Sequence, residues 1–434
     1  MNPIAVELNE LIKKDNPKVY EMLSDLGKSL FMPKGILTQS AEAKEKAYKF
    51  NATIGTATEN GKPMYLDCIY EGLKAFDPKD LFPYAPATGK PELRAKWKEK
   101  MLKENPAMNG KYISTPIVTN ALTHGLSIVA DMFMDNGDYV VMPDMFWGNY
   151  RLTFSVRRGA EISTFNTFTD DGKFDVNALL EKVKECAKIK DKVIIILNFP
   201  NNPAGYMPTV DEGKAIADGL IEIANSGTKL VVVTDDAYFG LFYEDSMTES
   251  LFGYLAGESD NLLAVKLDGA TKEEYVWGFR VGFITFGSTN NTPQANLLGA
   301  LEKKVAGLIR GTISNCPHPS QTFVLKALEH PNFYADKQKK YEIMKARGLK
   351  VKEVLNNSDY SDEFTYYPFN SGYFMCLKLK NVDAETLRVH LLEKYGVGTI
   401  SVNKTDLRIA FSCIEVEQVQ ELFDIIYKGC KDLA

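Results

Sequence analysis

The chain has 434 residues, of which 45% are hydrophobic and 25% charged, and its formal net charge is −6. This length exceeds the usual limit for a single hydrophobic core and predicts two domains. The mild acidity and the absence of a basic run interleaved with aromatic residues argue against a nucleic-acid-binding surface.

The cysteines and the apolar runs exclude further classes of protein. Six cysteines are scattered along the chain without a CxxC pair or a His/Cys ligand spacing, so no metal site is expected. Reduced thiols in a cytoplasm are the simpler interpretation. The N-terminus lacks the pattern of a signal peptide, and the longest apolar runs have the length of strands. We therefore expect a cytoplasmic protein without a membrane segment.

Short apolar runs alternate with helical patterns through the middle of the chain. We expect strands at 117–118, 139–142, 193–197, 230–233 and 262–265, and helices at 122–133, 176–189 and 210–225. Because these strands are continuously apolar, they predict a mostly parallel α/β sheet that is buried on both faces. Ligands of such sheets bind beyond the carboxyl ends of the strands.

The last hundred residues have a different pattern. A charged helical stretch at 332–355 precedes shorter strands near 372–379 and 407–412. This pattern predicts a smaller α+β domain at 326–434, after a large α/β domain at 61–325. Residues 1–60 are expected to form an N-terminal arm and part of the small domain.

Two polar motifs follow neighbouring strands. The segment 198–205, NFPNNPAG, has two prolines and a glycine that fix a turn, and its asparagines supply amides that can donate to a phenolate-like oxygen. A plain Asn/Pro turn is the alternative. Asp235-Asp236-Ala237-Tyr238 closes the next strand. A carboxylate there could pair with a protonated pyridine nitrogen, or it could simply cap a helix.

A third motif contains a lysine and an arginine at a fixed distance. Lys272 stands eight residues before Arg280 in the segment 269–282, GATKEEYVWGFRVG. The lysine amine can form a Schiff base with an aldehyde, and the arginine can bind a phosphate on the same small molecule. Pyridoxal phosphate (PLP) carries both groups.

In order and spacing, these three motifs resemble those of the fold-type I PLP-dependent enzymes. Within that group the chain is similar to the class I aminotransferases of the aspartate/aromatic branch, from about Asn51 to Ser412. The resemblance implies a large domain with a seven-stranded, mostly parallel sheet. It also implies transfer of an amino group from an L-amino acid to a 2-oxo acid such as 2-oxoglutarate.

The resemblance assigns the cofactor contacts residue by residue. Lys272 matches the Schiff-base lysine, which also moves a proton between the substrate Cα and the cofactor C4′. Asp235 matches the partner of the pyridine nitrogen, because the family motif counts three residues from this aspartate to the tyrosine. Tyr238 and Asn202 match the pair that binds the cofactor O3′. Arg280 matches the phosphate-binding arginine.

Two aromatic residues are also carried over from the family. Trp147, in FWGNY, resembles the aromatic residue that stacks on the pyridine ring, although a tryptophan of the core is the alternative. Tyr84, in YAPATG, matches a tyrosine that reaches the cofactor phosphate of a partner subunit. This role implies a homodimer with shared active sites, and a plain surface turn is the alternative.

The phosphate-binding segments depart from the family pattern. The family usually has Ser-x-Ser-Lys where this chain has Gly269-Ala270-Thr271-Lys272, so the hydroxyl three residues before the lysine is missing. In the loop after 117–118, Ala121-Leu122 replaces the usual Ser-Gly pair. Backbone amides at a helix N-terminus, at Leu122 and Thr123, can still bind a phosphate, and Thr123 could add a hydroxyl.

The substrate contacts rest on two arginines. Arg408 resembles the small-domain arginine that binds the α-carboxylate through two donors. Arg310, four residues before Ser314, resembles an arginine from the neighbouring subunit that binds a distal carboxylate. Together they predict a dicarboxylic substrate, aspartate or glutamate. Relatives that accept aromatic substrates carry the same arginine, and a solvated arginine is the alternative at either position.

Other residues are expected to border the substrate. Gly55 resembles a glycine whose backbone meets the substrate carboxylate, and Asn202 and Trp147 would lie beside it. The segment 35–37 resembles a lid. Two other functions stay open: a PLP-dependent lyase or decarboxylase of the same fold, and a non-catalytic regulator that kept it. Such regulators usually carry a DNA-binding domain, for which this chain has no spare length.

Overall fold

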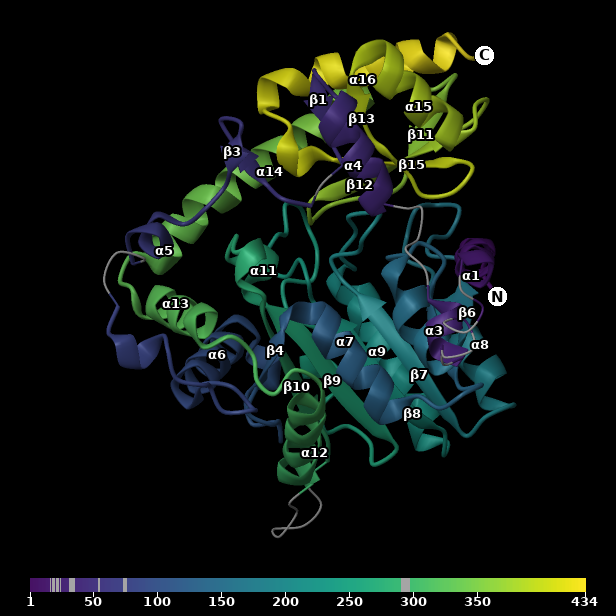
Figure 1. The fold of residues 1–434 in the computed structure, drawn as a ribbon. Coiled ribbons are helices and arrows are strands. Elements are labelled where there is room, and N and C mark those ends of the chain that lie inside the picture. Colours follow the sequence, from purple (N-terminus) through teal and green to yellow (C-terminus); the bar gives the residue numbers. More distant parts are fainter. Residues whose placement is uncertain are drawn as a thin grey trace.

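The computed structural model of the protein describes residues 1–434 except 16, 18–19, 21–22, 24, 31–35, 54, 73–75 and 290–296. Its largest feature is a seven-stranded sheet in the order β4-β10-β9-β8-β7-β5-β6 (Figure 1). The strands are β4 (Ile117–Asn120), β5 (Tyr139–Pro143), β6 (Glu161–Phe165), β7 (Lys192–Asn198), β8 (Lys229–Asp235), β9 (Leu262–Gly269) and β10 (Val281–Gly287). Only β10 pairs antiparallel, with β4 and β9. The predicted mostly parallel sheet is confirmed.

Helices cover both faces of this sheet, as continuously apolar strands require. Along β7, Ile194 and Ile196 pack in one apolar cluster with α7, whereas Val193 and Ile195 pack in another with α8 and α9. The helices of the large domain are α5 (Asp67–Gly72), α6 (Pro91–Glu104), α7 (Ala121–Phe133), α8 (Val176–Ala187), α9 (Val210–Asn225), α10 (Phe252–Leu255), α11 (Ala270–Glu273), α12 (Leu297–Thr312) and α13 (His318–Glu329).

A smaller domain packs on the carboxyl-end side of the large sheet (Figure 1). Its antiparallel sheet has the order β11-β12-β15-β14 and is joined by three helices. These elements are β11 (Phe364–Tyr366), β12 (Phe374–Leu379), β14 (Ile400–Ser401), β15 (Asp406–Ala410), α14 (Phe333–Asn357), α15 (Ala384–Tyr395) and α16 (Val419–Lys431). The predicted two-domain organisation is confirmed.

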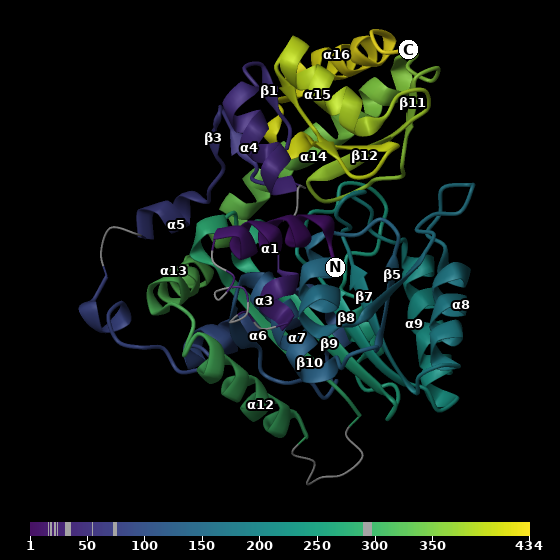
Figure 2. The same ribbon diagram turned by 45° about the vertical axis from the view of Figure 1, so that its right-hand side comes forward.

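The N-terminal residues divide between the two domains. The strand β1 (Phe50–Asn51) pairs with β13 (Val397–Gly398), and α4 (Ile36–Lys46) packs beside it, so this part belongs to the small domain. The helices α1 (Pro3–Asp15) and α3 (Asp25–Ser29) lie beside the large domain in both Figure 1 and Figure 2. A short hairpin, β2 (Thr58–Glu59) and β3 (Lys62–Pro63), follows β1. The boundaries at 60 and 325 stay a proposal.

Candidate active site

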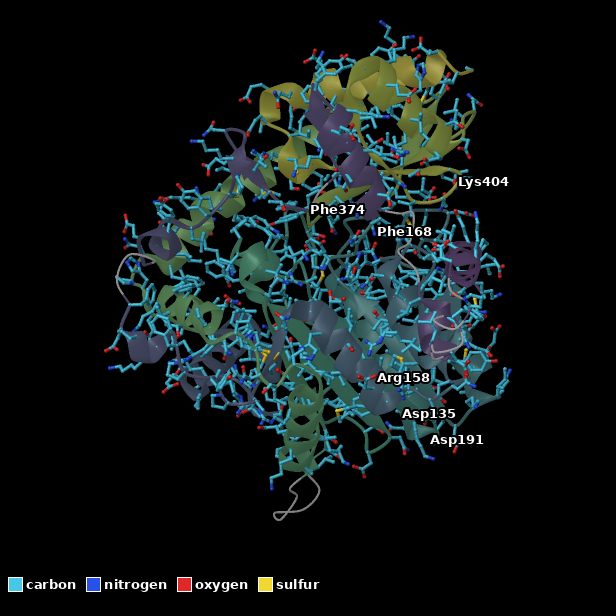
Figure 3. All side chains as sticks on the ribbon, in the orientation of Figure 1. Asp135, Arg158, Phe168, Asp191, Phe374 and Lys404 are labelled. Atoms are coloured by element: carbon cyan, nitrogen blue, oxygen red, sulfur yellow. The ribbon has the colours of Figure 1, made fainter. Side chains whose placement is uncertain are left out.

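A cavity of about 460 Å³ lies between the two domains, at the carboxyl ends of β4, β7, β8 and β9. Phe374 of β12 belongs to its wall and lies where the small domain faces the large one (Figure 3). Most of the residues predicted from the sequence line this cavity: Gly55, Leu122, Thr123, Trp147, Asn202, Asp235, Tyr238, Lys272, Arg280 and Arg408. The topology thus brings three distant motifs into one site.

The carboxylate of Asp235 is the most buried charged group on the large-domain side of the cavity. Asp235 is only 3% exposed at the end of β8. Its Oδ2 accepts a hydrogen bond of 2.6 Å from the Tyr150 hydroxyl, and its Oδ1 accepts one of 3.2 Å from the Ala237 N–H. Burial raises the pKa of Asp235 to about 6. Tyr150 orients this carboxylate and was not predicted from the sequence.

Lys272 lies on α11, directly after β9, and faces Asp235 and Tyr238. Its Nζ is 5.2 Å from the centre of the Tyr238 ring. Burial lowers the pKa of Lys272 to about 8, and the positive charge of Arg280 lowers it further, while Asp235 opposes the change. The amine therefore loses its proton more easily than an ordinary lysine, which is what a nucleophilic amine requires.

The two polar motifs after β7 and β8 are hydrogen-bonded to each other. The Asn198 amide donates to the Asp235 carbonyl at 2.8 Å, and the Asn202 N–H donates to Asn198 Oδ1 at 2.8 Å. Gly205 lets this turn approach the small domain, because it has a φ of +78° and a Cβ there would lie 1.9 Å from the Phe374 carbonyl oxygen. The turn thereby fixes Asn202 between the domains.

Arg408 enters the cavity from the small domain. It lies on β15 between two paired strands and is 1% exposed, so it is not a solvated edge arginine. Its Nη1 donates to Asn202 Oδ1 and its Nη2 to the Thr53 carbonyl, both at 2.9 Å. Its guanidinium carbon lies 4.1 Å from the centre of the Phe374 ring. These contacts fix the guanidinium in one orientation.

The N-terminus of α7 can bind an anion opposite Lys272. Ala121 and Arg280 both have left-handed backbones, with φ of +62° and +56°, and the Ala121 N–H donates to the Arg280 carbonyl at 3.1 Å. The first backbone amides of α7 and the Arg280 side chain border the same cavity. The Thr271 hydroxyl lies beside them, buried and without a hydrogen-bond partner. It was not predicted to bind the phosphate.

Gly269 explains the missing hydroxyl in the lysine loop. Gly269 pairs with Gly282 across β9 and β10. A Cβ at Gly269 would lie 2.7 Å from the Gly282 Cα and 2.7 Å from the Val281 carbonyl oxygen. Because both contacts are with backbone atoms, no side chain fits at this position. The departure from the family pattern is thus a consequence of how closely these two strands approach.

We expect Gly269→Ser to destabilise the protein rather than to improve phosphate binding. Forcing a side chain against the backbone of β10 should lower the free energy of unfolding by about 1–3 kcal/mol. Denaturant unfolding of the cofactor-free protein measures this loss. Gly278→Ser is the matched control, because a Cβ at Gly278 has no neighbour within 4 Å. Tighter cofactor binding by Gly269→Ser without a loss of stability would contradict the steric argument.

Two predicted residues do not line the cavity of their own chain. Tyr84 is 89% exposed. Arg310 is exposed near the end of α12, and its Nη1 donates to Ser314 Oγ at 2.6 Å. Both were assigned to an interface between subunits, and these roles stay predictions. The proposed lid at 35–37 begins at Gly35, which lies outside the described residues.

The arrangement defines a class of protein. A lysine with a lowered pKa, a buried carboxylate, and an anion site with an orphaned hydroxyl fit the aldehyde, the ring nitrogen and the phosphate of PLP. Among the described residues no group of three or more His, Cys, Asp or Glu side chains could hold a metal ion. The described helices include none that is long and apolar enough to cross a membrane. The site is that of a PLP-dependent protein.

Comparison with known proteins agrees with this class. The family model for aminotransferases of class I and II matches residues 55–426. A probable aspartate/prephenate aminotransferase of Aquifex aeolicus is 28% identical over 302 residues, which is 69% of this chain and 70% of the relative. An aspartate aminotransferase of Bacillus sp. is 24% identical, over 61% of this chain and 63% of the relative.

Solved structures have the same fold. An aminotransferase from Anaerococcus prevotii superposes with a TM-score of 0.82 at 23% identity, covering 94% of this chain and 98% of that one. A multiple substrate aminotransferase from Thermococcus profundus gives 0.77 at 19% identity, covering 96% and 98%. The chain belongs to the aminotransferase class I and II family, and it is a PLP-dependent transaminase.

Proposed function

We propose that this transaminase takes the amino group of a dicarboxylic L-amino acid, aspartate or glutamate, and passes it to a 2-oxo acid such as 2-oxoglutarate. The observation that supports an L-amino acid as the donor is the buried guanidinium of Arg408, held by Asn202 and Thr53 in the same cavity as Lys272. An arginine has five N–H donors, and these two bonds leave three for a carboxylate. The two similar relatives described above carry aspartate in their names.

A second carboxylate would need a further cation. In the described part of the cavity wall, the cationic side chains are Lys272, Arg280 and Arg408, and the first two face the cofactor site. Arg310 is exposed and has the family spacing, so we assign it to the cavity of a partner subunit. Exposed Tyr84 would reach the partner's phosphate site. The proposed active form is therefore a homodimer with shared active sites, and we propose the cytoplasm as its location because the scattered cysteines of the chain suit a reducing compartment.

Aromatic L-amino acids are the second candidate substrates. The side chains of Trp147, Trp277 and Phe374 line the cavity. Flat apolar walls of this kind can accept an aromatic ring as well as the methylene of a dicarboxylic acid. The two classes of substrate differ in whether Arg310 contributes to binding.

Several residues of the large-domain wall would each contact one group of the cofactor. PLP, when bound, supplies an electron sink that acidifies the substrate Cα–H bond. Asp235, oriented by Tyr150, would hold a proton on the ring nitrogen. Tyr238 and Asn202 would hydrogen-bond the phenolic oxygen. The amides at Leu122 and Thr123 would bind the phosphate with Arg280.

Lys272 and Arg408 would act on different groups of the substrate. Lys272 would hold the cofactor aldehyde carbon before the substrate arrives and then move a proton from the substrate Cα. Arg408 would bind the α-carboxylate and so direct the Cα–H bond toward the lysine. Because Arg408 would direct the Cα–H bond, and not the bond from Cα to the carboxylate, toward the reacting position, this contact favours transamination over decarboxylation.

The lowered pKa of Lys272 predicts how cofactor binding depends on pH. Only the neutral amine attacks an aldehyde, and its population falls tenfold for each pH unit below the pKa of about 8. We expect PLP to associate with the cofactor-free protein about 100-fold more slowly at pH 6 than above pH 9. Stopped-flow absorbance measures this rate. A rate that still rises almost tenfold between pH 8 and pH 9 would show that Lys272 has its ordinary pKa of 10.5.

The substrate assignment is tested on the PLP-loaded protein. L-aspartate, L-phenylalanine or L-alanine is added in turn, and absorbance follows the conversion of the cofactor to its amine form. Aspartate should react fastest, and Arg310→Leu should remove this preference. Lys304→Leu, an exposed cation on the same helix, is the matched control and should leave it unchanged.

The other outcomes of this experiment are also decisive. If phenylalanine reacts fastest and Arg310→Leu has no effect, the aromatic candidate replaces the dicarboxylic one. If none of the three amino acids converts the cofactor, the amino donor belongs to another class of substrate and both candidates are wrong.

A further inference from the structure

A second group of charged residues is buried behind the cavity, on the opposite face of β8 and β9. Asp235 and Asp236 are adjacent at the end of β8, and successive side chains of a strand point to opposite faces. Asp235 faces the cavity, so Asp236 faces away from it. Lys266 and Asp268 of β9 share the face of Asp236, as the register of the two strands requires.

These residues form an ion cluster that is almost completely closed to solvent. Lys266 is 1% exposed, and Asp236 and Asp268 are each 4% exposed. The Lys266 ammonium forms an ion pair with Asp236 and lies 3.0 Å from Asp268 Oδ2. Asp236 also accepts a hydrogen bond of 2.6 Å from the Ser250 hydroxyl, and Asp268 one of 3.2 Å from Trp97 Nε1. Two carboxylates and one ammonium leave one net negative charge.

None of the three charged residues lines the cavity, so they do not bind the cofactor or the substrate directly. We propose that Lys266 and Asp236 are positioning residues for Asp235: their ion pair holds the end of β8 against β9 and fixes a buried negative charge behind the Asp235 carboxylate. The effect of Lys266 and Asp236 on Asp235 does not depend on the proposed function. Only the consequence does, because it assumes that Asp235 serves the ring nitrogen of the cofactor.

The electrostatics around Asp235 support a role of this kind. Burial is the largest cause of its raised pKa, and the charge of Asp236 raises it further, while Tyr150 and Lys272 act in the opposite direction. The Tyr238 hydroxyl also interacts with Asp235. Because a carboxylate with a raised pKa shares a proton more readily with a pyridine nitrogen, the charge of Asp236 would strengthen that contact.

Lys266 determines the charge of Asp236. Burial raises the pKa of Asp236, and both the charge of Lys266 and its hydrogen bond oppose that rise. A buried carboxylate that loses its cation takes up a proton, because isolated charges are poorly solvated inside a protein. Without Lys266, Asp236 would therefore become neutral at a higher pH than in the native protein, and the charge behind Asp235 would be lost.

The test is an infrared titration of the cofactor-free protein with ¹³C-labelled aspartate carboxyl groups. Asp235→Asn identifies the band of Asp235, whose pKa is expected at about 6. Asp236→Asn keeps the shape of the side chain and removes its charge, so the pKa of Asp235 should fall by roughly one unit. Asp138→Asn is the matched control. Asp138 is buried at the other end of the sheet and paired with Lys192 at 2.6 Å, so its loss should leave Asp235 unchanged.

Lys266→Met provides the second arm of the test. The pKa of Asp236 in this variant should rise by roughly two units, seen as a carboxyl band that titrates at higher pH. An unchanged pKa of Asp235 in Asp236→Asn, or an equal shift in Asp138→Asn, would overturn the proposal. If Lys266→Met does not fold, the two isosteric aspartate variants decide alone. Because no cofactor or substrate is present, the result is independent of the substrate assignment.

Discussion

Lys272→Ala should reduce amino transfer by at least about 10⁴-fold, the largest loss expected of any single substitution in this chain. The variant removes both the amine that would hold the cofactor and the base that would move the Cα proton, and a positioned acid–base group alone contributes up to about 10⁴-fold. The conversion of PLP to its amine form by L-aspartate, followed over hours, measures the residual rate. Lys404→Ala, at the outer edge of the small domain (Figure 3), is the control and should keep full activity.

Folding stability separates this loss from damage to the structure. The pKa of Lys272 is lowered in the folded protein, so at pH 7 folding either buries an ammonium or releases a proton that the unfolded chain retains. Either process costs free energy, and the cost disappears as the pH rises above the ordinary pKa of 10.5. Lys272→Ala should therefore be at least as stable as the native protein at pH 7. A variant that keeps more than about 1% of the activity would exclude Lys272 as the proton carrier.

Much of the large sheet could be predicted because its central strands are buried on both faces. Such strands are continuous apolar runs, and β7 and β8 were predicted nearly to their ends. The edge strand β6 was not predicted, because Glu161 and Thr164 face solvent and interrupt its apolar pattern. The strand β10 was also missed. It follows Arg280 directly, and its first two residues belong to the segment 269–282 that is interpreted as a phosphate motif.

The candidate site could be predicted where a motif has a fixed spacing, as in Lys272 and Arg280. Tyr150 has no such signal, because only the folded chain shows that its hydroxyl points to Asp235. The steric reason for Gly269 was equally hidden, because the sequence of the segment 269–282 does not show that Gly269 and Gly282 pair across two strands. Contacts that depend on two strands meeting cannot be derived from either strand alone.

Arg408→Lys is expected to cause the second largest loss of activity. The loss should come from weaker recognition of the substrate rather than from weaker binding of the cofactor. Lysine keeps the positive charge, but its three N–H donors are too few to keep the bonds to Asn202 and Thr53 and also bind a carboxylate through two donors. Loss of two charge-assisted hydrogen bonds to the substrate costs about 3–6 kcal/mol, which lowers kcat/KM for L-aspartate by roughly 10²–10⁴-fold. Arg388→Lys is the matched control, because Arg388 is a buried arginine of the small domain that pairs with Glu42 and Glu385.

The role of Arg408 is decided by comparing two amino donors. If its guanidinium binds the α-carboxylate, Arg408→Lys should slow the reaction with L-aspartate far more than the slow reaction with an amine that lacks this carboxylate. If its main task is instead to join the two domains through Asn202 and Thr53, both donors should be slowed by the same factor. The ratio of the two losses therefore measures carboxylate recognition itself, because any change in the cavity walls affects both donors and cancels.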